Sequence, residues 1–311
     1  MTNLTAPIFH DEEAARAHFE AIRWPDGRAC PHCGTVGNST LMQGKTTRPG
    51  LYKCKERECR KPFTATMGTI YERSHVPLHK WLLATQLIVS SKKGLSAHQL
   101  YRQLGFGSYR TAWFVLMRIR EAMAPDEISP FGTGGMQVQV DEAYIGRKKG
   151  VDAGRGGFRH KMKVVTMIDQ ATGAARSVNP ENLNPGHVAK IVRDNVAKAA
   201  ILVTDEALHY KAVGREYSDH QSLLHGNREY ARGEFTTNSV EGYFSIFKRG
   251  MRGVYQHCSE HYLHRYLCEF DFRYTNRSAL GVNDSDRAQK ALEGTVGKRL
   301  MLKKPASYAA A

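Results

Sequence analysis

Four of the six cysteines stand in two close pairs, at a spacing that suits a metal ion. Cys30 and Cys33 form a C-x2-C pair, and further along the chain Cys54 and Cys59 form a C-x4-C pair. Four thiolates suit tetrahedral Zn²⁺, because soft sulfur ligands match this borderline-soft ion. A site with four cysteine ligands leaves no open position for a substrate, so the pairs predict structural zinc in a small ribbon.

Three acidic residues further along the chain could be brought together by a sheet and a helix. Asp141 lies in an alternating strand pattern, Asp205 directly follows an apolar strand, and Glu241 lies on a helical pattern that begins near Asn238. Long segments of the chain separate the three acids. Clustered carboxylates bind Mg²⁺ or Mn²⁺, and a metal pair can activate both oxygens of a phosphodiester exchange. The spacing alone favours three unrelated surface acids over a shared metal site.

Residues 76–124 predict three helices. The first begins near Pro77, and two shorter apolar patterns follow, divided by Gly105 and Gly107. The two shorter patterns favour a helix-turn-helix, in which Arg110 lies in the first turn of the second helix and can reach a DNA groove. Small helical bundles that bind nothing share this pattern, so that alternative stays open.

After a Pro- and Gly-rich linker at residues 125–135, strand and helix patterns alternate. Strands are expected at residues 136–145, 161–169 and 174–178, followed by a helix at 187–200 and a buried strand at 201–204. A further helix begins near Asn238. This order favours a mixed sheet flanked by helices, as in the ribonuclease H-like fold, although other α/β folds have the same order.

The charge of the chain points to a polyanionic partner. The 311 residues contain 45 Lys and Arg against 30 Asp and Glu, a formal net charge of +15, which favours nucleic acid. Mean hydropathy is −0.48, and the sequence has no apolar run long enough to span a bilayer, which argues against a membrane protein. We expect a soluble, cytoplasmic and nucleoid-associated protein. The basic run Arg147, Lys148 and Lys149 contacts DNA backbone in one interpretation and is a solvated loop in the other.

Several motifs occur together in one order. They are the ribbon from Cys30 to residues 62–64, V-D-E-A-Y-I-G at 140–146, T-D-E at 204–206, T-T-N-S-V-E-G-Y-F at 236–244 and K-R-G at 248–250. Over about residues 25–277 the sequence resembles the bacterial zinc-ribbon DDE-type insertion-sequence transposases, a family related to the Merlin transposases. The resemblance implies a DNA transposase.

The resemblance implies a multi-domain α+β protein. Its parts are an N-terminal segment and zinc ribbon at residues 1–75, a helix-turn-helix-like DNA-binding domain at 76–124 and a linker at 125–135. A ribonuclease H-like catalytic domain with a mixed sheet follows at 136–280, and a C-terminal tail at 281–311.

The resemblance also assigns the site. Asp141, Asp205 and Glu241 are the implied ligands of catalytic Mg²⁺ or Mn²⁺, and Lys248 is the basic partner for a DNA phosphate. The family pattern allows Asn as the third ligand, and Asn238 lies one turn before Glu241. Glu241 is preferred because a carboxylate neutralises a divalent ion. The expected DNA contacts are Arg110, Arg147, Lys148, Lys149, Lys248 and Arg249.

The implied activity is cleavage of element ends and joining of the 3′-hydroxyl to target DNA by two-metal transesterification. Its expected partners are the terminal inverted repeats and target DNA, with two copies of the chain acting as a homodimer on the DNA and no membrane involved. Two alternatives stay open. One is a domesticated DNA-binding regulator without catalysis, and the other is a ribonuclease H-like nuclease.

Overall fold

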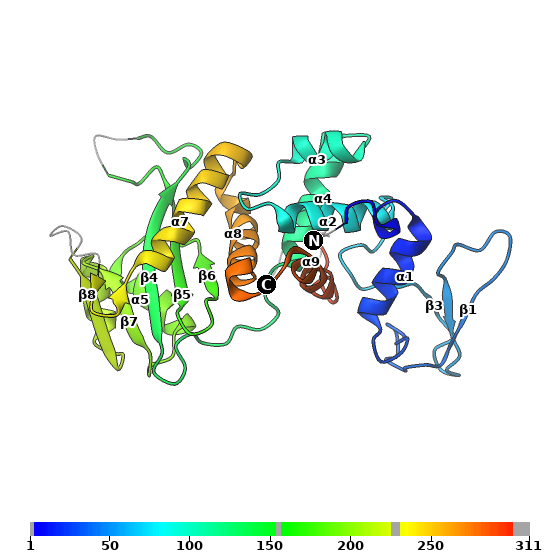
Figure 1. Cartoon of the computed structure of the whole chain (residues 1–311), viewed down its shortest axis with the longest axis horizontal. Coiled ribbons are helices and arrows are strands. Elements are labelled where there is room, and N and C mark those ends of the chain that lie inside the picture. Colours follow the sequence, from blue (N-terminus) through cyan, green and yellow to red (C-terminus); the bar gives the residue numbers. More distant parts are fainter. Residues whose placement is uncertain (1–2, 154–156, 225–230, 301–311) are drawn as a thin grey trace. The chain divides into compact units, whose positions relative to one another are not determined.

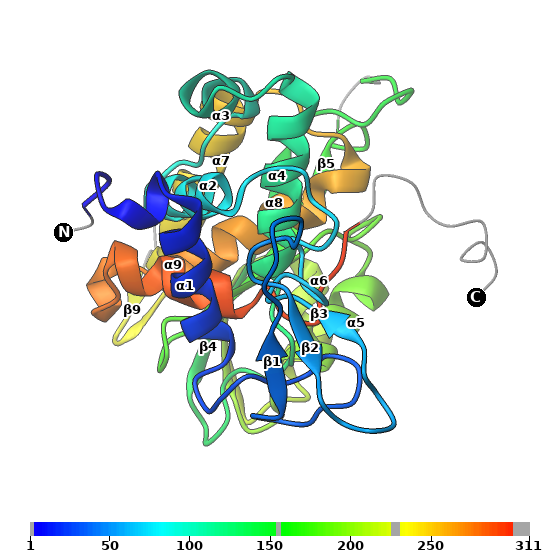
Figure 2. The ribbon, with the colours of Figure 1, turned by 90° about the vertical axis from the view of Figure 1, so that its right-hand side faces the viewer.

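The computed structural model describes residues 3–153, 157–224 and 231–300 and divides the chain into two compact units. Each unit has its own sheet and its own helices, labelled in Figures 1 and 2. The first unit comprises the described parts of Met1–Ser90, Ala97–Met123 and Asn283–Ala311. The second comprises those of Ser91–Ser96 and Ala124–Val282.

The first unit begins with a short 3-10 turn, Pro7–Phe9, and helix α1, Glu12–Arg23. Asp11 caps α1, because its carboxylate accepts the backbone N–H of Ala14 at 2.7 Å. A three-stranded antiparallel sheet follows, with β2 in the centre. Its strands are β1 Ser39–Leu41, β2 Tyr52–Cys54 and β3 Pro62–Phe63. The ribbon expected from the cysteine spacing is confirmed.

The three helices expected between residues 76 and 124 are present in the same unit. They are α2 Leu78–Ser90, α3 Ala97–Leu104 and α4 Tyr109–Ala122. The side chain of Ser108 caps α4 by accepting the N–H of Thr111 at 3.1 Å. The glycine-rich turn before Ser108 thus ends one helix and the cap starts the next.

The segment expected to be a C-terminal tail contains a packed helix instead, α9 Asp284–Glu293. This helix packs against α2. The guanidinium of Arg287 is buried and donates to the carbonyl of Val89 at 2.8 Å. The sequence hid α9 because Leu292 is the one large apolar residue of its buried face, which otherwise consists of Arg287, Ala288 and Ala291 and gives little apolar periodicity. Residues 301–311 lie outside the described part.

The second unit contains a five-stranded mixed sheet in the order β6-β5-β4-β7-β8. Strands β6, β5 and β4 are antiparallel, whereas β4, β7 and β8 are parallel. This is the expected ribonuclease H-like mixed sheet, with β8 as an edge strand that the sequence analysis lacked. The strands are β4 Gln137–Ile145, β5 Met162–Asp169, β6 Ala175–Val178, β7 Ile201–Asp205 and β8 Asp219–Leu223.

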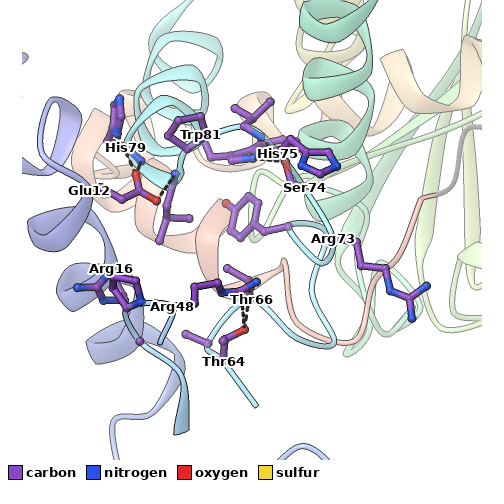
Figure 3. A pocket seen from close by; sticks show the side chains of 17 residues that line it. Glu12, Arg16, Arg48, Thr64, Thr66, Arg73, Ser74, His75, His79 and Trp81 are labelled. Carbon is purple, nitrogen blue, oxygen red and sulfur yellow. Dashed lines mark hydrogen bonds and ion pairs between the residues drawn. The ribbon is translucent and has the colours of Figure 1, made fainter. Parts of the chain in front are cut away.

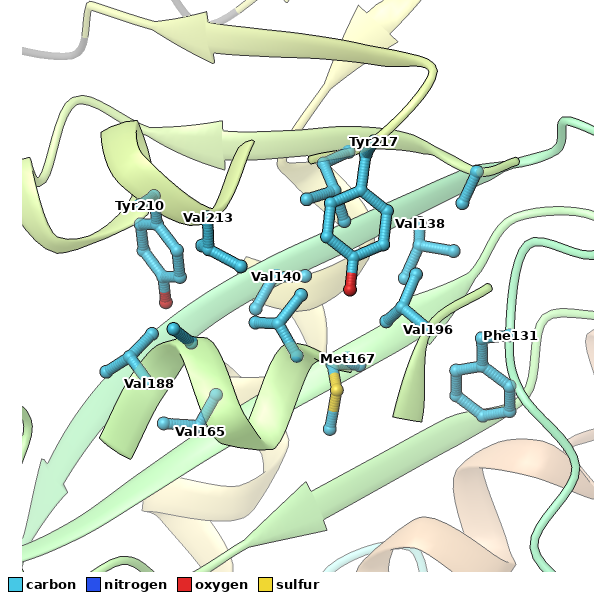
Figure 4. Packing of buried hydrophobic residues seen from close by; sticks show 14 residues of the cluster. Phe131, Val138, Val140, Val165, Met167, Val188, Val196, Tyr210, Val213 and Tyr217 are labelled. Carbon is cyan, nitrogen blue, oxygen red and sulfur yellow. The ribbon is translucent and has the colours of Figure 1, made fainter. Parts of the chain in front are cut away.

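One face of this sheet packs against helices α5, Pro185–Asn195, and α6, Leu208–Gly214. Figure 4 shows the core between them, in which Val138 and Val140 of β4 meet Val188 of α5 and Val213 of α6. The expected helix at 187–200 ends at Asn195, because Val196 leaves the helix to form a bridge with Phe131.

The opposite face carries α7, Asn238–Gly250, which continues through a π-helical turn, Met251–Tyr255. Helix α8, Glu260–Thr275, packs against β6. A short hairpin of β9, Ala231–Arg232, and β10, Phe235–Thr236, precedes α7, and a 3-10 turn, Ser278–Leu280, follows α8. None of the helices in the described ranges is long and apolar enough to span a membrane.

Candidate functional site

Asp141 and Asp205 lie at the same level of two neighbouring parallel strands. The register of β4 and β7 pairs Gln139 with Val203, and each aspartate stands two residues further along its own strand. Alternation along a strand keeps residues i and i+2 on one face, so both carboxylates extend from the same side of the sheet. The sheet therefore brings together two acids that lie far apart in the sequence.

Glu142 contributes a third carboxylate to this group. Ligand oxygens of Asp141, Glu142 and Asp205 all lie within 4.8 Å of one another. The carboxylate of Glu142 also accepts a hydrogen bond from the Tyr210 hydroxyl at 2.8 Å and lies 3.3 Å from Nε2 of His209. Helix α6 thus holds Glu142 from the side opposite α7.

The electrostatics of this carboxylate group favour a bound cation. Burial raises the pKa of Asp141 to about 7, and the negative charge of Glu142 adds to the effect. The backbone N–H of Glu142 and the charge of Lys248 oppose it. Burial lowers the pKa of His209, but its hydrogen bond to Glu142 and that residue's charge outweigh burial and raise it overall. Clustered carboxylate oxygens are the ligands that Mg²⁺ and Mn²⁺ prefer, so this donor set fits such an ion.

Helix α7 lies on the face of the sheet opposite α6, which is the face from which Asp141 and Asp205 extend. The side-chain oxygen of Gln139 accepts the backbone N–H groups of Ser239 and Val240, each at 3.1 Å, and so fixes the start of α7 on β4. Further along the helix, the positive charge of Lys248 acts on Asp141. Helix α7 packs on β4 and β5, and the charge of its residue Lys248 lowers the pKa of Asp141.

Glu241 and Asn238 stand in the first turn of α7, and both are exposed. The hydroxyl of Thr237 donates to Glu241 at 2.8 Å. Among the carboxylates of the described residues, the group with oxygens within 4.8 Å of one another includes Glu142 and not Glu241. The structure brings Asp141 and Asp205 together and leaves both third-ligand candidates on the exposed side of the helix.

The basic residues expected to contact DNA differ in how free they are. Lys148 forms an ion pair with Glu260 and donates to the carbonyl of Glu181, so its ammonium is engaged within the protein. Arg249 folds back along α7 and donates to the carbonyl and hydroxyl of Ser245. Arg110 at the start of α4, Arg147, Lys149 and Arg249 are exposed, and Arg147 also lies 3.9 Å from the carboxylate of Asp152.

The four paired cysteines form a second group, in the first unit. Their sulfur atoms lie within 4.8 Å of one another, with Cys30 and Cys59 3.8 Å apart and Cys33 and Cys54 3.7 Å apart. Sulfurs at the corners of a tetrahedron around Zn²⁺ with bonds of about 2.3 Å stand about 3.8 Å apart. The described geometry therefore fits a zinc ion held by all four thiolates.

Three residues that lie around the carboxylate group or hold α7 on β4 were absent from the sequence-based site, namely Gln139, His209 and Tyr210. In the sequence, the one signal for Gln139 was its place in the alternating segment M-Q-V-Q-V. The structure shows that this polar side chain is buried. His209 and Tyr210 lie on the short helix α6, and only the folded chain shows that they contact Glu142.

With this geometry established, comparisons with known proteins identify the class. Residues 133–275 match the family model described as an ISXO2-like transposase domain. Residues 10–62 match the one described as a transposase zinc-ribbon domain. Together the two models cover more than half of the chain. The chain belongs to the family of insertion-sequence transposases that combine a zinc ribbon with a DDE-type transposase domain.

A relative from Halobacterium salinarum, an uncharacterized protein in transposable element ISH50, is 27% identical over 288 residues. The match covers 85% of this chain and 91% of that protein. Among solved structures, one similar chain is in the cryo-electron microscopy structure of the simian T-cell lymphotropic virus intasome in complex with PP2A regulatory subunit B56 gamma. That match has 10% identity and a TM-score of 0.31 over 59% of this chain and 66% of that chain.

Proposed function

We propose that this protein cleaves DNA at the ends of its element and joins the exposed 3′-hydroxyl to target DNA by transesterification. One observation carries the proposal. Asp141 and Asp205 lie side by side on β4 and β7, inside the segment that matches the transposase family model. Adjacent carboxylates in this arrangement are what a phosphodiester reaction with divalent ions requires.

In this proposal Asp141 and Asp205 hold Mg²⁺ or Mn²⁺, and Glu241 is the third ligand in preference to Asn238. When bound, such ions activate the attacking and leaving oxygens of a phosphodiester. Lys248 binds the phosphate beside the site, since its charge already acts on Asp141. Tyr210 and His209 hold the carboxylate of Glu142 in place.

The first unit supplies DNA binding in the same proposal. The zinc ribbon, with Zn²⁺ on its four cysteines, and α3 with α4 contact the terminal inverted repeats, and Arg110 reaches the groove. In the second unit, Arg147 and Lys149 bind backbone phosphates near the catalytic site. Because two element ends must be cut and joined, two chains act together as a homodimer on DNA. The proposed place of action is the cytoplasm, at the nucleoid.

A strand-transfer assay tests this function. Purified protein is incubated with Mg²⁺ or Mn²⁺ and labelled DNA that carries the element's own ends, and joined products are expected. Asp141→Asn should abolish joining while it retains the oxygen that accepts the N–H of Glu142. Glu206→Gln, an exposed neighbour of Asp205, is the matched control. DNA binding without cleavage would indicate a regulator instead, and hydrolysis without joining a nuclease.

A further inference from the structure

A pocket of about 470 Å³ lies within the first unit, apart from the carboxylate group and the cysteines. Four chain segments line it. These are the beginning of α1, the loop at residues 48–50 between β1 and β2, residues 64–66 after β3, and the segment 71–81 that leads into α2. Figure 3 shows this pocket with its lining side chains. Ribbon and helices therefore share one concave site.

The lining of the pocket is strongly basic. Glu12 is its one acidic residue among the described ones, and its carboxylate is already engaged. It accepts the backbone N–H groups of Leu78 and His79 at 2.9 and 3.1 Å and pairs with Nδ1 of His79 at 2.9 Å. Glu12 thus caps the start of α2. The basic side chains of the lining are Arg16, Arg48, Arg73, His75 and His79.

Two of these arginines have no acidic partner. Within the described part of the chain, neither Arg16 nor Arg48 forms an ion pair. Arg73 also lines the pocket, but it pairs with Glu72 at 3.8 Å, and Figure 3 shows it extending away from the other labelled side chains. Arg16 and Arg48 are thus the lining arginines without an acidic partner among the described residues. A pair of uncompensated guanidinium groups in one concave site favours an anion with several oxygens.

Local contacts position the guanidinium group of Arg48 and the aliphatic stem of Arg16. Nη2 of Arg48 donates to the Thr64 hydroxyl at 3.2 Å, and Thr64 in turn shares a hydrogen bond of 3.0 Å with Thr66. The stem of Arg16 lies against Gly50, where a Cβ would collide with Cδ of Arg16. Gly50 has a φ of +71°, a conformation that glycine adopts without strain. The loop is therefore shaped to accept the Arg16 side chain.

We propose that Arg16 and Arg48 bind a backbone phosphate of the DNA held by the first unit, a proposal that rests on the DNA-binding function proposed above. The two aromatic residues of the lining, Tyr71 and Trp81, are only 3% and 2% exposed, so the pocket offers little surface on which a base could stack. The recognised group is thus the phosphodiester and not a nucleobase. The charge of +15 favours a long polyanion over a small phosphate.

The test measures DNA affinity as a function of salt for Arg16→Gln, Arg48→Gln and the double variant. Glutamine keeps a side-chain stem over Gly50 and removes the charge. Fluorescence anisotropy with a labelled element-end duplex at about 50–200 mM KCl gives the slope of log K against log[salt]. Because the two arginines bind one phosphate, the double variant should reduce this slope by about 1, and neither single variant should reduce it by more than that.

Lys290→Gln is the matched control, because it removes one exposed positive charge from α9, outside the pocket lining. Unchanged zinc content and tryptophan emission establish that the variants fold. Pocket variants that bind like Lys290→Gln would overturn the proposal and leave the transposase function intact. Wild-type protein that binds no element-end DNA would overturn both. Saturable binding of inorganic phosphate that needs both arginines, with DNA binding unaffected by their loss, would also overturn it and indicate a small-anion site.

Discussion

The hydroxyl of Tyr243 on α7 donates a 2.6 Å hydrogen bond to the buried carboxylate of Asp271 on α8. The same carboxylate accepts the backbone N–H of Ser177 at 2.8 Å and its hydroxyl at 2.7 Å. Ser177 pairs across the strands with Thr166, and Thr166 pairs with Asp141. One buried network therefore fixes α7, the helix of Glu241 and Lys248, to the row of sheet residues that contains Asp141.

Removal of this anchor should destabilise the second unit. Asp271→Ala leaves the Ser177 N–H without its hydrogen-bond partner, whereas the Tyr243 hydroxyl keeps its 2.9 Å contact with the Ser177 hydroxyl, so the loss should cost about 1–3 kcal/mol. Tyr243→Phe removes one hydroxyl and should cost about 1 kcal/mol. All three tryptophans, Trp24, Trp81 and Trp113, lie in the first unit, so hydrogen exchange of α7 amides is the suitable measurement. Equal exchange rates in Asp271→Ala and the wild type would contradict this role.

The same carboxylate should make stability depend on pH. Burial raises the pKa of Asp271 from 3.8 to about 6, although hydrogen bonds from Tyr243 and Ser177 oppose the shift. A raised pKa means that the folded state binds the proton more tightly, so this stabilisation is complete below about pH 4 and is lost as the pH rises through about 6. Between pH 5 and 7 the wild type should lose about 1 kcal/mol relative to Asp271→Asn. Urea unfolding of both proteins by circular dichroism measures the difference, and parallel pH profiles would disprove the assignment.

The elements that carry the acids were predictable because they have strong patterns. Strand β4 begins with an alternation of polar and apolar residues, β7 is a short run that is mostly β-branched or apolar, and α7 begins where the sequence shifts to helical spacing. The edge strand β8, with the sequence D-H-Q-S-L, has no such pattern, since it is partly exposed and its pairing with β7 defines it. Helix α9 was missed for a related reason, because its buried face is small and partly charged.

Spacing along the chain predicts on which face of a strand each acidic side chain of the candidate site lies, but not how far that side chain reaches. Strand alternation correctly separates Glu142 from Asp141, and the hydrogen bond from Tyr210 to Glu142 agrees with it. Alternation does not show that the longer Glu142 side chain returns to within 4.8 Å of both aspartates. The pocket of Arg16 and Arg48 combines segments that are distant in the sequence, so no local pattern reveals it.

Zinc removal should unfold the ribbon and leave the second unit folded. The ribbon core contains few residues besides the cysteines, mainly Tyr52 and Phe63, with Trp24 packed edge-on against both at 5.8 and 6.1 Å. A core this small depends on its metal, whose binding energy of about 10–16 kcal/mol is folding energy. A chelator, or Cys54→Ser, should therefore shift Trp24 emission to longer wavelength and abolish binding of element-end DNA. Cys258→Ser, outside the cluster, should change neither. Tryptophan emission that stays at its original wavelength after the metal is removed would contradict this prediction.

The third metal ligand can be assigned by comparing Glu241→Gln, Asn238→Ala and Glu142→Gln in the strand-transfer assay. Glutamine at position 241 retains an oxygen that accepts the Thr237 hydroxyl, so the first turn of α7 persists while the charge is lost. Loss of a ligand charge worth several kcal/mol in the transition state should lower the joining rate about a thousandfold.

Asn238→Ala should reduce joining far less, because Asn238 contributes no charge to a divalent ion. Glu142→Gln should lower the joining rate by an intermediate factor, about tenfold to a hundredfold. The carboxylate of Glu142 orients groups around the site and is held by Tyr210 and His209. Metal dependence separates the two roles. Glu241→Gln should require more Mn²⁺ for half-maximal joining, whereas Glu142→Gln should require the wild-type concentration. The opposite result, with the metal requirement raised in Glu142→Gln alone, would make the adjacent group of Asp141, Glu142 and Asp205 the complete ligand set.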